Sequence, residues 1–423
     1  MEMKRGLDSY EFYAFEDNGE EELIDEVRKM EENSKWIPGI RCRDLKVYAI
    51  DGAALFDAES TSKPTISTSV LASQKDADPE LIEDTRSTNG MGLAINLGHQ
   101  YALLRNTAYN GLCNAAKING SALSNLLRKD AKVEDSIGGR VGFAEIINIA
   151  TTVAKGSALA LMRYGKLSAL HSNADGGYEV MPISKLLEIT ADAIRSRFGT
   201  AKFVEGYNSH SYTSAVWTLP DAQSRLLQMY QDAIDKNGGS KYAVDFMPIV
   251  RFSSSDTSAS CATLEPMFEV SRNETPIRFC DPVKIKHTKR SDKSKKIGLE
   301  AFQEQSQTIY AKFEESAKKI AELSSITVMN PCNCVVSLCN KYDIGKKYGE
   351  AARAEVEAIS GGAYLSAHDV YLSMTEVVAE AIRLGASDET ITRMEEAVAK
   401  VLHADWAEHD IGGTVPWKAS NAA

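Results

Sequence analysis

The chain has 423 residues, of which 43% are hydrophobic and 25% charged, and its 48 Lys and Arg against 59 Asp and Glu give a net charge of −11. This composition is that of a folded globular protein and excludes disordered, collagen-like and disulfide-scaffold proteins. The acidic balance argues against a protein that coats nucleic acid with its whole surface.

Neither membrane insertion nor secretion is predicted. No apolar run approaches the roughly 18 to 20 residues that span a bilayer, and the acidic N-terminus lacks the apolar core of a signal peptide. The seven cysteines are odd in number and show no regular spacing, which is typical of free thiols in a reducing compartment. We therefore expect a cytoplasmic protein.

The N-terminal third is predicted to be mixed in structure. A strand is expected over residues 45–50, ending at a turn, and the Ser-, Thr-, Asp- and Pro-rich residues 57–90 show no period and predict a long loop. Short helical patterns occupy residues 97–127. A helix over residues 143–153 is apolar on most sides, so we expect it to be buried.

Strands and helices alternate more clearly in the central third. Apolar runs at 157–163 and 166–172 flank Tyr164-Gly165 and predict a hairpin, and amphipathic patterns predict helices at 183–198 and 220–235. Further strands are expected at 201–206, 212–219, 242–253, 261–270 and 275–285. This order favours an α+β fold with a mixed, mainly antiparallel sheet over a parallel doubly wound one.

After residue 297 the hydrophobic period changes to that of helices. One long amphipathic helix is predicted from Phe302 to Leu323, and others at about 346–358, 367–384 and 388–405. The chain therefore divides into an acidic N-terminal segment, a mixed region, a sheet-rich core and a helical C-terminal layer, at residues 1–33, 34–156, 157–296 and 297–423.

Charge is unevenly distributed along the chain. Residues 1–33 carry twelve acids and four bases, a local charge of −8, whereas residues 284–296 carry seven bases and one acid, a local charge of +6. The second segment is a candidate nucleic-acid-binding site, comprising Lys284, Lys286, His287, Lys289, Arg290, Lys293, Lys295 and Lys296. A solvated connector would account for this composition equally well.

No catalytic signature is present, so the sequence predicts no cofactor and favours a protein that is not an enzyme. It contains no Walker A motif, no H-E-x-x-H and no G-x-S-x-G. A metal-dependent enzyme using Asp256 and His287 is disfavoured because no second carboxylate has a suitable spacing.

Two groups of potential metal ligands lack the spacing of a metal site. Cys332, Cys334 and Cys339 lack the paired spacing of zinc sites and lie among apolar residues, which favours burial. His403 and His409 are six residues apart, which places them about 240° apart on a continuous helix, unless the helix ends between them. We therefore predict no metal site.

A hydroxyl-rich segment at Ser255, Asp256 and Thr257 follows an apolar strand. The favoured interpretation is a turn in which Asp256 accepts hydrogen bonds from its own backbone. The alternative is a polar site that holds a phosphate or a metal ion.

Several ordered segments together resemble a known family. These are residues 166–178 (KLSALHSNADGGY), the turn at 255–258, Lys286-His287-Thr288, and the terminal series Glu395-Glu396, Trp406, Asp410 and Trp417. Over roughly residues 95–417 the chain resembles the phage/plasmid-like family known as domain of unknown function 932. Residues 173–177 enlarge one loop and residues 1–33 have no counterpart. The resemblance implies a mobile genetic element and transfers no catalytic residue.

Two functions follow as hypotheses. The first is a DNA-binding protein that holds single strands in recombination or replication, with the basic segment on phosphates and strand aromatics stacked on bases, namely Tyr242, Phe246, Phe252, Phe268 and Phe279. Burial of these aromatics in the core is the favoured alternative for the rings. The second function is a protein-binding factor directed at a host system, which would use the acidic surface. No membrane partner is expected.

Overall fold

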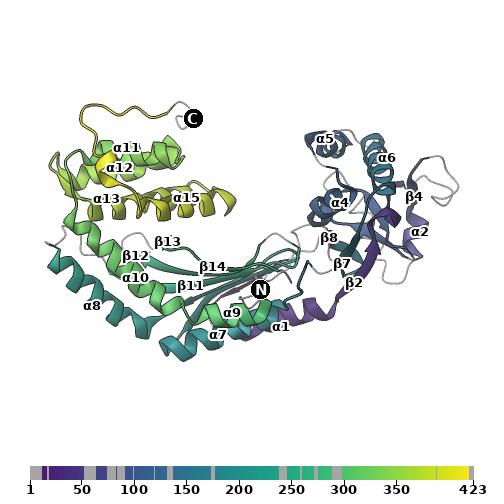
Figure 1. Ribbon diagram of the computed structural model, residues 1–423, viewed down its shortest axis with the longest axis horizontal. Coiled ribbons are helices and arrows are strands. Elements are labelled where there is room, and N and C mark those ends of the chain that lie inside the picture. The colour runs from purple at the N-terminus through teal and green to yellow at the C-terminus, as the bar shows by residue number, and fades with distance from the viewer. Residues whose placement is uncertain are drawn as a thin grey trace.

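The computed structural model describes residues 12–16, 19–51, 63–73, 82, 91–98, 100–118, 120–130, 137–172, 177–237, 245–257, 260–270, 275–287, 298–386 and 388–418. These residues form an arch with three parts (Figure 1). We name them the N-terminal unit (34–172), the central unit (12–33 and 177–325) and the C-terminal unit (326–418).

The N-terminal unit is built on a sheet with the strand order β2-β7-β8-β6-β5-β3-β4. The strands are β2 (Ser34–Arg41), β3 (Lys46–Asp51), β4 (Thr65–Ser67), β5 (Leu93–Asn96), β6 (Tyr101–Leu104), β7 (Ser157–Arg163) and β8 (Lys166–Ser172). Helices pack against the sheet or against one another, namely α2 (Thr68–Ala72), α4 (Tyr109–Ala116), α5 (Ser121–Asp130) and α6 (Gly138–Thr152).

The hairpin predicted over residues 157–172 is present, with Tyr164 and Gly165 at positive φ in its turn. Its strands pair with β2 and β6, so it belongs to the N-terminal unit and not to the sheet-rich core expected to begin at residue 157. Apolar alternation identifies a strand but does not identify its partner, which is why this boundary differs.

Helix α6 also differs from expectation. It begins at Gly138, five residues before the predicted start, and ends at Thr152; Ile149 is 71% exposed and Val153, just after the helix, is 79% exposed. Phe143 and Ile147 are buried against the sheet. The helix is therefore buried along one stripe only.

The central unit contains the second sheet, with the order β1-β9-β10-β11-β12-β13 and β14 paired to β12. Its strands, all antiparallel to their partners, are β1 (Phe12–Glu16), β9 (Lys202–Ser209), β10 (Thr213–Thr218), β11 (Phe246–Ser254), β12 (Ala262–Val270), β13 (Thr275–Arg278) and β14 (Val283–Ile285). The acidic N-terminal segment supplies β1, so that segment is part of this unit.

Five helices accompany the central sheet: α1 (Glu20–Glu32), α7 (Ile183–Phe198), α8 (Pro220–Lys236), α9 (Gly298–Ser306) and α10 (Ile309–Glu322). Their apolar stripes share one core with alternate residues of the strands, among them Phe252, Leu264 and Phe268. The intervening residues face the other side of the sheet because strand side chains alternate. This side, the polar face, carries Ser214, Arg251, Ser253, Thr263 and Glu265.

The C-terminal unit is helical, as predicted, with one small two-stranded sheet. Its elements are β15 (Thr327–Val328), α11 (Pro331–Lys341), α12 (Lys346–Ser360), β16 (Leu365–Ser366), α13 (Ala367–Met374), α14 (Glu376–Arg383), α15 (Asp388–Val401) and α16 (Trp406–His409).

Two helices predicted to be continuous are each divided. The helix expected at 302–323 breaks between α9 and α10, and that at 367–384 breaks between α13 and α14. At each break a hydroxyl donates to a nearby carbonyl, Thr308 to that of Gln305 and Thr375 to that of Leu372. Such side-chain bonds compete with the helical backbone pattern.

The α+β class, with mainly antiparallel sheets and packed helices, is confirmed. Across the part of the chain described here, no helix is long and apolar enough to cross a bilayer.

Candidate functional site

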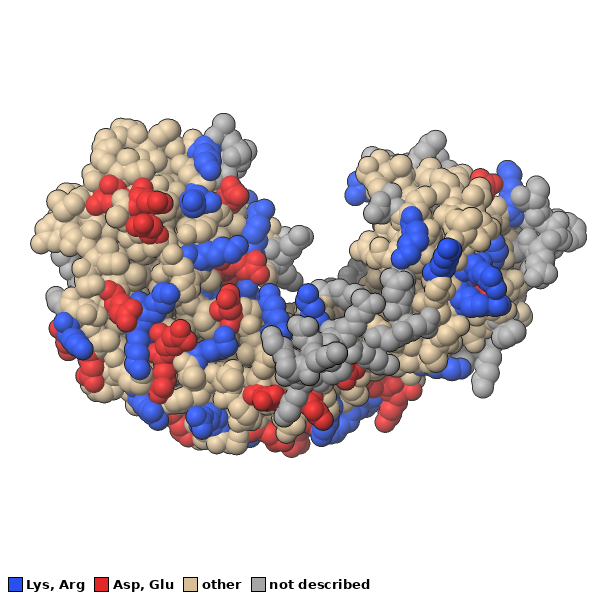
Figure 2. All heavy atoms as spheres, in the orientation of Figure 1, with Lys and Arg blue, Asp and Glu red and all other residues tan. Residues whose placement is uncertain are grey.

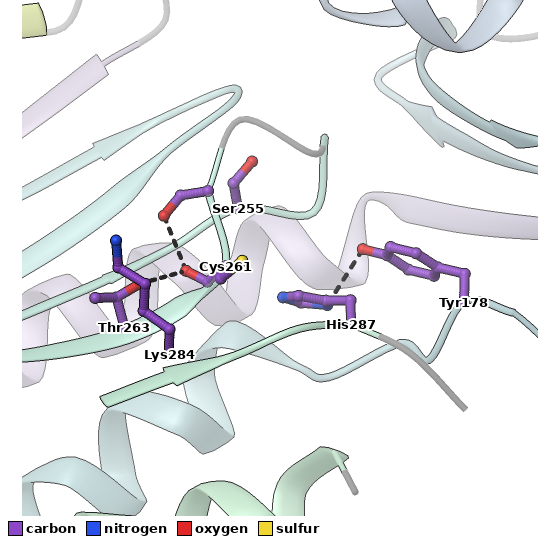
Figure 3. A pocket seen from close by; sticks show the side chains of 7 residues that line it. Tyr178, Ser255, Cys261, Thr263, Lys284 and His287 are labelled. Atoms are coloured by element: carbon purple, nitrogen blue, oxygen red, sulfur yellow. Dashed lines mark hydrogen bonds between the residues drawn. The ribbon is translucent and has the colours of Figure 1, made fainter. Parts of the chain in front are cut away.

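A pocket of about 470 Å³ lies at the β14 edge of the central sheet and opens to solvent. Three segments form it: the residues that lead into α7, the connection from β11 to β12, and β14 with the residue pair after it (Figure 3). Its lining residues are Tyr178, Ser255, Ser260, Cys261, Thr263, Lys284 and His287. We call it the sheet-edge pocket.

Strand β14 directs Lys284 into this pocket. Val283 and Ile285 are buried in the core of the central unit, so Lys284 between them projects from the polar face beside its cross-strand partner Thr263. Lys284 and Lys286 are exposed, and neither makes an ion pair or hydrogen bond with another described residue. Their charges are therefore available to a ligand.

His287 supplies a second polar group. Its Nδ1 lies 3.2 Å from the hydroxyl of Tyr178, and its Nε2 is buried without a hydrogen bond to any described residue. In Figure 3 this second nitrogen points away from Tyr178, toward the side where Cys261 and Lys284 lie. Burial lowers the pKa of His287 to about 4, so the ring is neutral at pH 7. The Tyr178 hydroxyl lies within hydrogen-bond distance of both His287 Nδ1 and the Asp256 carbonyl, at 3.2 and 3.4 Å, and its single proton serves only one of them. When it serves Nδ1, Nε2 carries the ring proton and can donate to a ligand.

Stacked rings fix His287 in place. The Tyr178 ring lies between those of His171 and His287, at centroid distances of 3.7 and 5.4 Å, and Trp36 packs against both His171 and Tyr178. Burial lowers the pKa of His171 to about 4, and its Nε2 donates to the carbonyl of Asp256 at 3.1 Å. Because Trp36 and His171 belong to the N-terminal unit, these rings join that unit to the pocket.

The turn predicted at Ser255, Asp256 and Thr257 is present, but Asp256 has a different role. Its carboxylate forms an ion pair with Arg163 of β7 at 3.0 Å, and the two side chains are 6% and 1% exposed. Burial raises the pKa of the Asp256 carboxyl even beside this guanidinium. The expected hydrogen bonds to its own backbone are replaced by a contact between units, while its second carboxylate oxygen, Oδ1, is buried without a hydrogen bond to any described residue.

The two hydroxyls of this turn are directed at the backbone. Ser255 and Thr257 both donate to the carbonyl of Ser211, at 2.6 and 3.2 Å. Of the three predicted polar-site residues, only Ser255 lines the sheet-edge pocket. The turn therefore forms one wall of the pocket without supplying its charge.

The structure brings together two groups of residues that were predicted separately. Ser255 lines the same pocket as Lys284 and His287, with Lys286 beside it on the exposed side of the chain. The remaining predicted cations, Lys289, Arg290, Lys293, Lys295 and Lys296, lie outside the described residues.

The prediction that strand aromatics stack on bases is wrong for the four phenylalanines that the structure describes. Phe246, Phe252, Phe268 and Phe279 are at most 4% exposed and pack in the core on the helix-covered side of the sheet. Tyr242 lies outside the described residues. Tyr178, Ser260, Cys261 and Thr263 were not predicted as pocket residues. Their segments are far apart in the sequence and meet through the pairing of β12 with β14 and the backbone contact of Glu179 with His287.

Acidic side chains are absent from the pocket lining and few on the described surface of the N-terminal unit. None of the seven lining residues carries a carboxylate. The described surface of the N-terminal unit carries seven exposed Lys or Arg side chains and two exposed acidic side chains. The cations are Lys35, Arg41, Arg43, Lys63, Lys117, Arg128 and Lys155, and the acids are Asp44 and Glu145. Lys and Arg side chains likewise gather on this unit, at the right of Figure 2.

The Cys and His residues considered as metal ligands each make separate structural contacts. Cys334 and Cys339 are buried in α11, and burial raises the pKa of the Cys334 thiol to about 12. His403 contacts Lys319, whereas His409 contacts the hydroxyl of Ser337. In the described ranges, no three His, Cys, Asp or Glu side chains converge in a metal-binding arrangement.

No family model, no curated protein and no solved structure matches this chain.

Proposed function

We propose that this protein binds single-stranded nucleic acid through its sugar–phosphate backbone, without sequence specificity, and that the sheet-edge pocket holds a phosphate. The observation that carries the proposal is the donor set of the pocket. Lys284 is unpaired among the described residues, His287 directs an unused ring nitrogen toward the pocket, and no lining residue is acidic.

This donor set suits a phosphodiester. A lysine acts on phosphate as a compact point charge, and a neutral histidine adds an N–H donor. The hydroxyls of Ser260 and Thr263 both donate to the carbonyl of Cys261, at 2.9 and 3.2 Å, so this backbone acceptor is already hydrogen-bonded. Since lysine contacts with phosphate read no base edges, binding is expected to be independent of sequence.

The biological setting is also part of the proposal. The resemblance to a phage/plasmid-like family supports a mobile genetic element, where single strands arise during recombination and replication. Lys284 and Lys286 begin a segment with a local charge of +6, which supports a contact of several phosphates rather than a single bound anion.

The test is the salt dependence of binding. Fluorescence anisotropy with a labelled single-stranded oligonucleotide is measured from about 25 to about 300 mM salt. Each phosphate contact contributes about 0.7 to the slope of log K against log salt, so Lys284→Gln with Lys286→Gln should flatten the slope by about 1.4. A matched control replaces Lys236 and Lys318, which are exposed on α8 and α10, and should leave the slope unchanged.

Two outcomes would contradict the proposal. The first is no binding by the wild type at the lowest salt, which would leave a protein-binding factor directed at a host as the working hypothesis. The second is an equal loss of slope in the pocket and control variants, because this would show a diffuse charge effect without a role for the pocket.

A further inference from the structure

A line of side chains crosses the polar face of the central sheet from the sheet-edge pocket. Lys284 is paired across strands with Thr263, Thr263 with Ser253, Ser253 with Ser214, and Ser214 with Tyr207. Residues directly opposite in a ladder share one face. With strands about 4.8 Å apart, this line extends roughly 19 Å from Lys284 to Tyr207.

The far end of this line carries two aromatic rings. Tyr207 lies in β9, and Tyr212 lies in the turn to β10 with its hydroxyl bonded to Ser253. Their ring centroids are 6.4 Å apart, and both side chains are partly exposed. They therefore differ from the strand phenylalanines, which lie on the helix-covered side and are buried.

The two outer units flank this line. On one side Arg251, two residues before Ser253, bonds to Glu395 of the C-terminal helix α15. On the other side Asp256, three residues after Ser253, is paired with Arg163 of the N-terminal unit. Figure 2 shows the molecule hollowed between these two outer units.

Lys284 is exposed at one end of the line and Tyr207 is partly exposed at the other, whereas Thr263 and Ser253 between them are only 4% and 7% exposed. The line is therefore accessible mainly at its two ends.

We infer that a single strand spans the two accessible ends of this line and that Tyr207 and Tyr212 are its base-stacking residues, at the end opposite the phosphate contact of Lys284. The inference rests on the proposed function and adds the part of the ligand that is recognised besides phosphate. Stacking on tyrosine tolerates every base because each base has a π-face, which agrees with binding that is independent of sequence.

The experiment compares two probes with the same number of phosphates, an oligothymidylate and an abasic oligonucleotide of equal length. Stacking is worth about five-fold or more in affinity per base, so the wild type should prefer the thymidylate by at least about five-fold. Tyr207→Leu with Tyr212→Leu should abolish this preference and leave the salt slope unchanged. Tyr207→Phe with Tyr212→Phe retains the rings and should retain the preference, provided that circular dichroism shows both variants folded.

The outcomes separate this inference from the proposed function. If the wild type binds both probes equally and Lys284→Gln still flattens the slope, the stacking inference is wrong and the phosphate pocket stands. If the thymidylate preference survives in the double leucine variant, the bases stack elsewhere and the inference is again wrong. If neither probe binds at the lowest salt, the proposed function itself fails.

Discussion

The central sheet meets the two outer units through different arrangements of buried charge, and the central unit also shares one apolar core with the C-terminal unit. At the N-terminal junction one ion pair, Arg163 with Asp256, is buried beside the neutral rings of Trp36, His171 and Tyr178. At the C-terminal contact two arginines and three glutamates form a network. Arg251 and Arg278 both pair with Glu265, Arg251 also pairs with Glu395, and Arg278 also pairs with Glu396.

The two contacts are expected to respond differently to the loss of one charged group. A lone buried pair leaves an uncompensated charge when one partner is removed, whereas a network leaves each arginine with another carboxylate. The N-terminal junction also holds two imidazoles that burial keeps neutral, and protonation would charge them there. We therefore expect the junction to respond strongly to one substitution and to pH, and the network to respond weakly.

The largest effect is expected for Arg163→Met. It removes the partner of Asp256 and also the hydrogen bonds to the carbonyl of His210 and the hydroxyl of Ser34. The loss should be about 3 to 5 kcal/mol, read from hydrogen exchange of the peptides covering β7 and β8. Adding Asp256→Asn should restore part of this loss. Arg43→Met, at an exposed position in the same unit, should change exchange by less than about 0.5 kcal/mol, and an equal effect there would contradict the prediction.

The next effect is the pH dependence of the same junction. The pKa of His171 and of His287 is about 4 in the fold, against about 6.5 in an unfolded chain. Between these values the unfolded state binds more protons, so the stability contributed by the neutral rings is complete above about pH 6.5 and is lost as the pH falls toward 4. Asp256 acts in the opposite sense because its pKa is raised. We expect the two imidazoles to dominate, so that protection of the junction falls as the pH falls.

This pH effect is measured by hydrogen exchange of β7 and β8, corrected for the intrinsic pH dependence of exchange. The variant His171→Gln with His287→Gln should lose most of the pH response. A wild-type junction whose protection is constant from pH 6.5 to 4 would show that these imidazoles do not control it.

Features set by residues close together in the sequence are predicted correctly, whereas features set by contacts between distant segments are not. Helix α7 has the predicted bounds because an amphipathic stripe and the stop at Gly199 are local signals. Lys284 and Ser255 were each identified, but their meeting in one pocket depends on the pairing of β12 with β14. The rings of Trp36, His171 and Tyr178 are brought together by contacts between units, and nothing in their local sequence predicts that arrangement.

The smallest effect is expected from substitutions in the C-terminal charge network. Glu395 accepts from Arg251 at 2.6 Å and its side chain is 4% exposed, yet Arg251 also donates to Glu265. Glu395→Gln removes one charge and leaves the arginine paired, so protection of α15 should fall by only about 1 to 2 kcal/mol. Glu396 is 42% exposed, and Glu396→Gln should cost less than about 0.5 kcal/mol. If Glu395→Gln instead released α15 as strongly as Arg163→Met releases β7 and β8, the charges would act as a single essential pair, and the contrast between the two contacts would be wrong.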